Sequence, residues 1–311
     1  MKNVLLWLRI VRPQTLFASM VPVLIGLWSS HEIVRAGFSA EVSHRALIGV
    51  MTLICSLSLQ ILSNLINDYY DYVRGTDKAG RAGFKRALAE GEVTKGQMKA
   101  ACFIALGVAV CIGLYLVISG GLPILLIGVT AILFAWLYTA TSHSLSYLGI
   151  ADIFVFLYYG VLATAGTVWL QLHIFCKEAF MAGAVCGLIS MCVLMVNNLR
   201  DMESDRASGK KTLPVRFGKN AAHGILLVIV LMVPTLMWLM EHRGISVSYC
   251  LFGSYFLVSD RTISTKVVYV PMMVIMMSYY FRIVKAEGAK YNICLLQAGI
   301  INVIYLLLFM L

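Results

Sequence analysis

Carboxylates and asparagines are concentrated in two short stretches of the sequence. The first acidic stretch holds Asn64, Asn67, Asp68, Asp71 and Asp77, and the second holds Asn197, Asn198, Asp201 and Asp205. In both, an asparagine stands four residues before an aspartate, as Asn67 does before Asp71. Side chains three or four positions apart share a helix face, so each stretch predicts a polar stripe at a helix end.

Metal binding is the chemistry that such stripes favour. Grouped carboxylates repel one another, and a charge inside a membrane helix costs about 2.5–3.5 kcal/mol at the helix centre, so bridging cations are expected. The donors are oxygens without Cys or His, and Mg²⁺ binds one or two carboxylates together with substrate phosphates. The alternative is a solvated helix end neutralised by neighbouring Arg and Lys, which the repetition of the pattern disfavours.

Basic residues follow both acidic stretches. They are Lys78, Arg81, Lys85 and Arg86 after the first, and Arg206, Lys210, Lys211 and Arg216 after the second. A diphosphate needs this combination, because a metal ion binds some of its oxygens and basic side chains donate to the rest. The alternative is the general excess of basic residues on the cytoplasmic side of a membrane, which we favour for Lys95, Lys99 and Lys219.

The composition indicates that membrane helices position these groups. Of 311 residues, 60% are hydrophobic and 13% charged, which excludes a water-soluble domain and predicts an all-α, polytopic membrane helix bundle. Uncharged runs suited to one span lie at 13–30, 46–67, 153–176, 179–199, 220–240 and 291–311. The run 100–151 suits two spans with a turn at 119–123. In 244–281 we expect one span at 264–283, with 245–258 in the interface or lengthening that helix.

The basic residues also set the orientation. The formal net charge is +10, and Lys and Arg gather before Pro13, at 74–99, at 200–219 and at 282–290. Nine spans place all four clusters on the cytoplasmic side, with the N-terminus inside and the C-terminus outside. The excess charge is then mostly a topology signal, which disfavours nucleic acid as a partner. The eight Cys residues form no C-x-x-C pair, which disfavours metal or redox use.

Four segments make the chain resemble the UbiA-type intramembrane prenyltransferases. They are residues 59–71 with Gly75 and Asp77, residues 81–91, residues 147–152 and residues 197–218. The spacing of Asp71 and Asp77 around Gly75 resembles most closely the branch that acts on 1,4-dihydroxy-2-naphthoate in menaquinone biosynthesis, as does the Asn-Asn-Leu-Arg-Asp form of 197–201. The chain departs from the family's usual pattern at Phe84, which replaces a Pro.

The resemblance implies a single UbiA-type domain over residues 1–311, with nine helices around a central cavity and the acidic stretches at its cytoplasmic mouth. It implies Mg²⁺ at Asp68, Asp71, Asp77, Asp201 and Asp205, with Asn67 and Asn198 completing or orienting the coordination shells. It implies a diphosphate site at Lys78, Arg81, Arg86, Arg206, Lys210 and Lys211. Among these residues Asp71, Asp201 and Arg86 are the expected catalytic groups.

The implied reaction moves a polyprenyl group from polyprenyl diphosphate to 1,4-dihydroxy-2-naphthoate with loss of CO₂, giving demethylmenaquinone, at the bacterial cytoplasmic (inner) membrane. Asp152, at the start of the fifth span, is a further catalytic candidate that would accept a proton from the acceptor's hydroxyl or orient an Arg. Its alternative role is to cap that helix. His143 stands where the family usually has Lys or Arg, and a neutral imidazole gives a diphosphate less help.

Two other functions stay open. The same enzyme type acting on 4-hydroxybenzoate, haem or another aromatic acceptor would share every feature above. A membrane cation transporter or channel would also use paired Asp and Asn at helix ends. The basic loops would repel cations, however, and the other spans carry almost no polar path, which disfavours transport.

Overall fold

The computed structural model describes residues 2–38, 43–75, 86–138, 145, 149–242 and 268–310. Within these residues every regular element is a helix. The elements are α1 (Lys2–Val11), α2 (Pro13–Arg35), α3 (Arg45–Val73), α4 (Lys95–Leu137), α6 (Ala151–Phe156), the π-helical η1 (Leu157–Val161), α7 (Leu162–Leu172), α8 (Lys177–Arg200), α9 (Met202–Ala207), α10 (Leu213–His242), α11 (Tyr269–Val284) and α12 (Lys290–Met310). The predicted all-α fold is confirmed.

Seven helical segments of the described chain are long and apolar enough to cross a membrane. They are α2, α3, α4, α6 to α7 taken together, α8, α10 and α12. The chain is therefore an integral membrane protein. α11 has 16 residues, fewer than a full span needs, and it covers most of the predicted span 264–283. Residues 245–258 lie outside the described part, and the count of nine spans stays a prediction.

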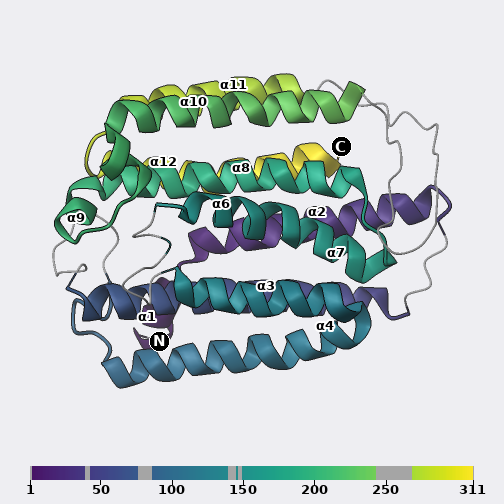
Figure 1. Cartoon of the computed structure of the whole chain (residues 1–311), viewed down its shortest axis with the longest axis horizontal. Coiled ribbons are helices and arrows are strands. Elements are labelled where there is room, and N and C mark those ends of the chain that lie inside the picture. Colours follow the sequence, from purple (N-terminus) through teal and green to yellow (C-terminus); the bar gives the residue numbers. More distant parts are fainter. Residues whose placement is uncertain are drawn as a thin grey trace.

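α4 is folded back on itself, as Figure 1 shows. Its 43 residues would form a straight helix of about 65 Å, roughly twice the thickness of a bilayer core. Instead Gly121 has φ 66° and ψ −152°, a conformation open essentially to glycine alone, and Pro123 follows it. The indole N–H of Trp169 on α7 donates to the Gly120 carbonyl at 2.7 Å and covers the turn. The predicted turn at 119–123 is confirmed.

α8 is the central helix of the bundle. In its most apolar stretch 72% of residues are buried, the largest share among the spans of the described chain. Its side chains form a core with residues of α2, α10, α11 and α12. On another side α8 meets η1 backbone to backbone, since a Cβ added at Gly160 would lie 2.5 Å from the Gly187 Cα. Glycines therefore set how closely the span α6–η1–α7 approaches the centre.

The helix ends that carry the acidic stretches and basic clusters meet at one end of the bundle, on the left in Figure 1. Contacts between distant segments fix this arrangement: Arg12 and Arg86 with Asp68, Lys210 with Asp71, and Arg200 with Asn292. Each of the basic clusters before Pro13, at 74–99 and at 200–219 thus contributes one residue that contacts an aspartate on α3. Arg200 connects the third of these clusters to the start of α12. This arrangement agrees with the predicted common side, whereas the membrane face to which it belongs stays a prediction.

Candidate functional site

A cavity of about 530 Å³ lies between the helices. Its polar lining includes Arg12, Asn67, Asp71, Arg86, Asn197, Asn198, Arg200, Asp201, Asp205 and Lys210. Its apolar lining follows α4 as far as Leu116 and Ile124, on either side of the α4 turn. Near the polar part the Phe134 ring lies against Phe154 and Tyr158, with centroids 4.1 and 5.2 Å apart. The cavity thus joins a charged mouth to an apolar, partly aromatic interior.

The first acidic stretch forms the predicted stripe on α3. Asn64, Asp68 and Asp71 are 6%, 3% and 3% exposed. The helix ends two residues before Gly75, whose φ of +72° turns the chain. The first acidic stretch therefore ends with its helix, just before this glycine. The predicted site residues Asp77, Lys78 and Arg81 lie outside the described residues, as does His143.

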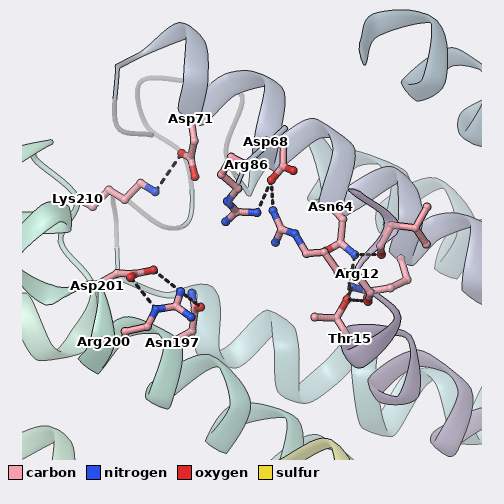
Figure 2. A network of polar contacts seen from close by, with 12 residues as sticks. Arg12, Thr15, Asn64, Asp68, Asp71, Arg86, Asn197, Arg200, Asp201 and Lys210 are labelled. Carbon is pink, nitrogen blue, oxygen red and sulfur yellow. Dashed lines mark hydrogen bonds and ion pairs between the residues drawn. The ribbon is translucent and has the colours of Figure 1, made fainter. Parts of the chain in front are cut away.

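Asp68 is bound by two arginines (Figure 2). Its Oδ1 accepts from Arg12 Nη2, at the start of α2, and from Arg86 Nη1, between α3 and α4. Both arginines line the cavity, whereas Asp68 does not. The position of Asp68 therefore suits the holding of two guanidinium groups at the mouth better than direct contact with a ligand in the cavity.

Asn64, one turn earlier on α3, holds the junction between α1 and α2 from which the Arg12 side chain projects (Figure 2). Its Nδ2 donates to the Val11 carbonyl at 3.1 Å and to Thr15 Oγ1 at 2.9 Å. Between them Arg12 has a φ of 57°, in the left-handed region that a non-glycine residue rarely adopts. The polar stripe on α3 thus has two effects on Arg12: Asn64 holds the junction that carries it, and Asp68 binds its guanidinium group.

Lys210 joins the two acidic stretches. Its Nζ lies 3.0 Å from Asp71 Oδ1 and 3.9 Å from Asp205 Oδ1. All three residues are buried, and the backbone N–H of Lys210 donates to the Asp205 carbonyl at 2.9 Å. Gly209, with φ +78°, makes the turn that brings Lys210 back over Asp205. One ammonium group is therefore shared by a carboxylate from each stretch.

Asp201 is bound by its neighbour Arg200 through both carboxylate oxygens, at 2.8 Å from Nε and 2.6 Å from Nη2. The same guanidinium donates to Asn197 Oδ1 at 2.6 Å and to Asn292 Oδ1 at 2.9 Å. α8 ends here, since Asp201 has φ −95° and ψ 8°, so a bend interrupts the stripe predicted for the second stretch. Asp201 and Asp205 nevertheless both line the cavity.

The predicted basic residues divide into two groups. Arg86 and Lys210 line the cavity. Arg206 is exposed and pairs with Glu203 at 3.1 Å, and Lys211 is exposed as well. Neither residue lines the cavity, and Lys211 is exposed whereas its neighbour Lys210 is buried. The structure thus places Arg206 and Lys211 outside the lining of the cavity, and their part in a diphosphate site stays a prediction.

Arg12 and Arg200 belong to this site although the sequence reasoning did not predict them. Arg12 lies 56 residues from Asp68 in the chain, and it reads as an ordinary basic residue before the first span. Arg200 reads as a neutralising neighbour of the second stretch. The signal that could have found both is their position, since each directly adjoins an apolar span at the end that carries the carboxylates.

Tyr138 and Asp152 lie near the mouth. Tyr138 lines the cavity just past α4. Burial raises the pKa of Tyr138, and the negative charge of Asp152 raises it further, so its hydroxyl stays protonated at neutral pH. Asp152 is 5% exposed, and its Oδ1 has no hydrogen-bond partner among the described residues. The N-cap of α6 is Ile150, so Asp152 is not the N-cap itself, although its carboxylate lies in the first turn of that helix, where it complements the helix dipole.

The donor set fits a hard divalent cation that binds together with a ligand. In the part of the chain that the structure describes, no three acidic, His or Cys side chains form a set able to hold a metal ion by themselves. Asp71 and Asp205 do present oxygens to one shared cation, the Lys210 ammonium. Two carboxylates completed by ligand phosphates are a usual environment for Mg²⁺.

Comparison with known proteins gives one family throughout. A sequence model described as the UbiA prenyltransferase family matches residues 19–266. The chain is similar to the 1,4-dihydroxy-2-naphthoate octaprenyltransferase of Escherichia coli K12, with 35% identity over 224 residues that cover 68% of each chain. It is also similar to the protein of the same name from Haemophilus influenzae, with 30% identity over 68% of this chain and 69% of that one.

A solved structure shares the fold. It is that of a UbiA homologue from Archaeoglobus fulgidus bound to GPP and Mg²⁺, with a TM-score of 0.65 and 18% identity over 97% of both chains. At this identity the likeness concerns the fold, and it extends over nearly the whole helix bundle.

Proposed function

The chain belongs to the UbiA prenyltransferase family, and from that premise we propose that it transfers a polyprenyl group from a polyprenyl diphosphate to 1,4-dihydroxy-2-naphthoate. The carboxylate of the acceptor leaves as CO₂, which gives the reduced form of demethylmenaquinone. The names of the Escherichia coli and Haemophilus influenzae relatives support this acceptor. We place the protein in the bacterial cytoplasmic membrane, as one domain over residues 1–311 with its charged end toward the cytoplasm.

One observation carries the proposal: both acidic stretches and three arginines meet at the mouth of an apolar cavity. Arg12, Arg86 and Arg200 line that mouth together with Asp71, Asp201 and Asp205. A prenyl diphosphate has the same division, since its head is charged and its tail is wholly apolar. The mouth suits the head and the interior suits the tail.

Asp71, Asp201 and Asp205 are the described residues that we assign to Mg²⁺, with Asp77 as a further ligand and Asn67 and Asn198 beside them in the lining. When bound, Mg²⁺ supplies positive charge that stabilises the departing diphosphate. The Archaeoglobus fulgidus homologue that was solved with GPP and Mg²⁺ supports Mg²⁺ as the metal. Asp68, held by Arg12 and Arg86, acts in this proposal by positioning those two side chains.

The arginines assist the first step. The bond between the allylic carbon and the diphosphate oxygen breaks, and its electron pair leaves with the diphosphate. Arg12, Arg86 and Arg200 donate hydrogen bonds to the oxygens on which negative charge grows. An allylic cation remains in the cavity, where Phe134 and Tyr158 exclude water and present ring faces that attract positive charge.

The acceptor then supplies the electrons of the new bond. The ring carbon that bears the carboxylate attacks the allylic cation, the bond from that carbon to the carboxylate then breaks, and its electron pair restores the aromatic ring as CO₂ departs. We assign to the protonated Tyr138 hydroxyl a hydrogen bond that orients the acceptor. Asp152, buried nearby, accepts the proton of the acceptor's hydroxyl through Tyr138, which raises the electron density of the ring, and returns it to that oxygen once CO₂ has left.

An assay with purified protein, Mg²⁺ and a polyprenyl diphosphate tests the proposal against two acceptors. We expect product with 1,4-dihydroxy-2-naphthoate and none with 4-hydroxybenzoate. Product with 4-hydroxybenzoate alone would show that the acceptor is wrong while the enzyme class is right. No product with either acceptor, together with cation flux in proteoliposomes, would replace the enzyme by a transporter.

A further inference from the structure

The carboxylates at the mouth differ in how firmly they are held. Two arginines bind Asp68, and the fork of Arg200 binds both oxygens of Asp201. Asp71 and Asp205 instead both contact the Lys210 ammonium, at 3.0 and 3.9 Å. A guanidinium is a planar fork that fixes geometry, whereas an ammonium is a compact point charge on a flexible stem. Asp71 and Asp205 are thus the pair that can exchange its cation most readily.

The surroundings let the Lys210 side chain move while its backbone stays in place. The backbone N–H of Lys210 is bonded to the Asp205 carbonyl at 2.9 Å, so the turn is fixed independently of the ammonium. The side chain is one of the cavity-lining groups, so a ligand that enters the mouth can reach the ammonium. A divalent cation between Asp71 and Asp205 would repel the ammonium strongly, since unit charges about 4 Å apart interact appreciably even near a protein surface.

We propose that Lys210 is an exchangeable counter-cation: it occupies the space between Asp71 and Asp205 until a divalent metal and a diphosphate arrive, and it then moves onto the diphosphate oxygens. The inference rests on the proposed function of this site and adds that the metal binds tightly only together with the diphosphate. Without a diphosphate the displaced ammonium gives up its contacts with the two carboxylates and gains no phosphate in return, so metal binding is weak. With a diphosphate present, the ammonium and the metal both gain a partner. Lys210 therefore couples metal binding to donor binding.

The test measures binding rather than turnover, with Mn²⁺ as the probe metal, followed by electron paramagnetic resonance on purified protein in detergent. Lys210→Met removes the competing charge, so donor-free Mn²⁺ binding becomes tighter by about tenfold, a common size for coupling between two ligands. Lys210→Arg places a fork between the two carboxylates, so donor-free Mn²⁺ binding becomes weaker. Lys285→Met, an exposed lysine at the same end of the bundle, serves as the matched control and leaves Mn²⁺ affinity unchanged.

A second arm adds a prenyl thiodiphosphate, an analogue that resists ionisation. It tightens Mn²⁺ binding to the unaltered protein and does so much less in Lys210→Met. Equal donor-free affinity in the unaltered protein and Lys210→Met would overturn the inference, as would weaker binding in Lys210→Met. If Lys210→Met does not fold, Lys210→Arg decides, because unchanged or tighter donor-free binding there contradicts the exchange. Failure of the unaltered protein to bind the thiodiphosphate would count against the proposed function, while the donor-free arm still tests Lys210.

Discussion

Asp68 and Asp71 lie within one turn of α3, are equally buried and nevertheless meet different cations. Arg12 and Arg86 bind Asp68, whereas Asp71 faces the cavity and pairs with Lys210. Two identical side chains on one helix therefore have separate tasks. In the proposed function Asp68 positions the arginines that receive the diphosphate, and Asp71 binds a metal ion.

This division predicts different defects for two matched substitutions. In Asp68→Asn the arginines lose their anionic anchor, so the KM for the prenyl diphosphate rises by about 10- to 100-fold, as expected for loss of a supporting group, while the Mg²⁺ requirement stays the same. In Asp71→Asn turnover is lost or needs far more Mg²⁺. Initial rates measured against donor and against Mg²⁺ separate the two effects, and size-exclusion profiles verify folding. An unaltered donor KM in Asp68→Asn would contradict the positioning role.

Some residue contacts of the site could be predicted from the sequence and others could not. The stripe of Asn64, Asp68 and Asp71 was predictable because a helix repeats every three to four residues. The pairing of Arg12 with Asp68 was not, because it depends on how α2 packs against α3 across 56 residues of chain. The choice of Lys210 over Lys211 depends on a turn at Gly209 that only the folded chain reveals.

At the scale of elements, the span α6–η1–α7 is shaped by its glycine contacts with α8. The π-helical segment interrupts the α-helix, and Tyr159 inside it has φ −92° and ψ 16°. Such segments occur often at functional sites, and here it contributes Tyr158 and Tyr159 to the cavity. Nothing in the apolar run 153–176 predicted it, because no proline marks the interruption. The turn of α4 was predictable, since glycines and Pro123 do mark it.

We therefore expect Gly160→Ala to destabilise the bundle. The new methyl group would lie 2.5 Å from the Gly187 Cα, and backbone atoms cannot move aside as a flexible side chain can. Overpacking of this kind costs about 1–3 kcal/mol or more and displaces the cavity wall. Thermal unfolding in detergent measures the loss. Gly107→Ala on α4 is the matched control, because nothing lies within 4 Å of its added Cβ, and an equal loss there would contradict the packing argument.

At the scale of the whole molecule, the cavity connects one end of the bundle to residues near the α4 turn. Gly113 and Gly128 belong to its wall on the two arms of α4, and an added Cβ at either position meets nothing within 4 Å. The wall thus leaves open space beside the path that we assign to the prenyl tail. The sequence could not predict this space, because it arises from the packing of several helices.

Filling the wall is expected to shorten the prenyl chain that the protein accepts. Gly113→Leu projects an isobutyl group into the cavity, so donors with long tails lose turnover while a short donor such as geranyl diphosphate retains it. Rates measured across donors of increasing length, with the same acceptor, test this expectation. Gly107→Leu lies on the same arm of α4 but outside the lining, and it should leave the length profile unchanged. A uniform decrease for all donors would indicate general damage instead.

The gathering of the paired acids and arginines at one end of the bundle also has an electrical consequence. Moving one elementary charge across a membrane exchanges about 2.3 kcal/mol with a potential of 100 mV. A diphosphate that arrives and leaves at the same end crosses none of that field, and the apolar prenyl tail that extends along the cavity carries no charge. Turnover in sealed vesicles is then expected to be independent of the membrane potential. The protein can therefore form its lipid-soluble product in a membrane that carries no potential.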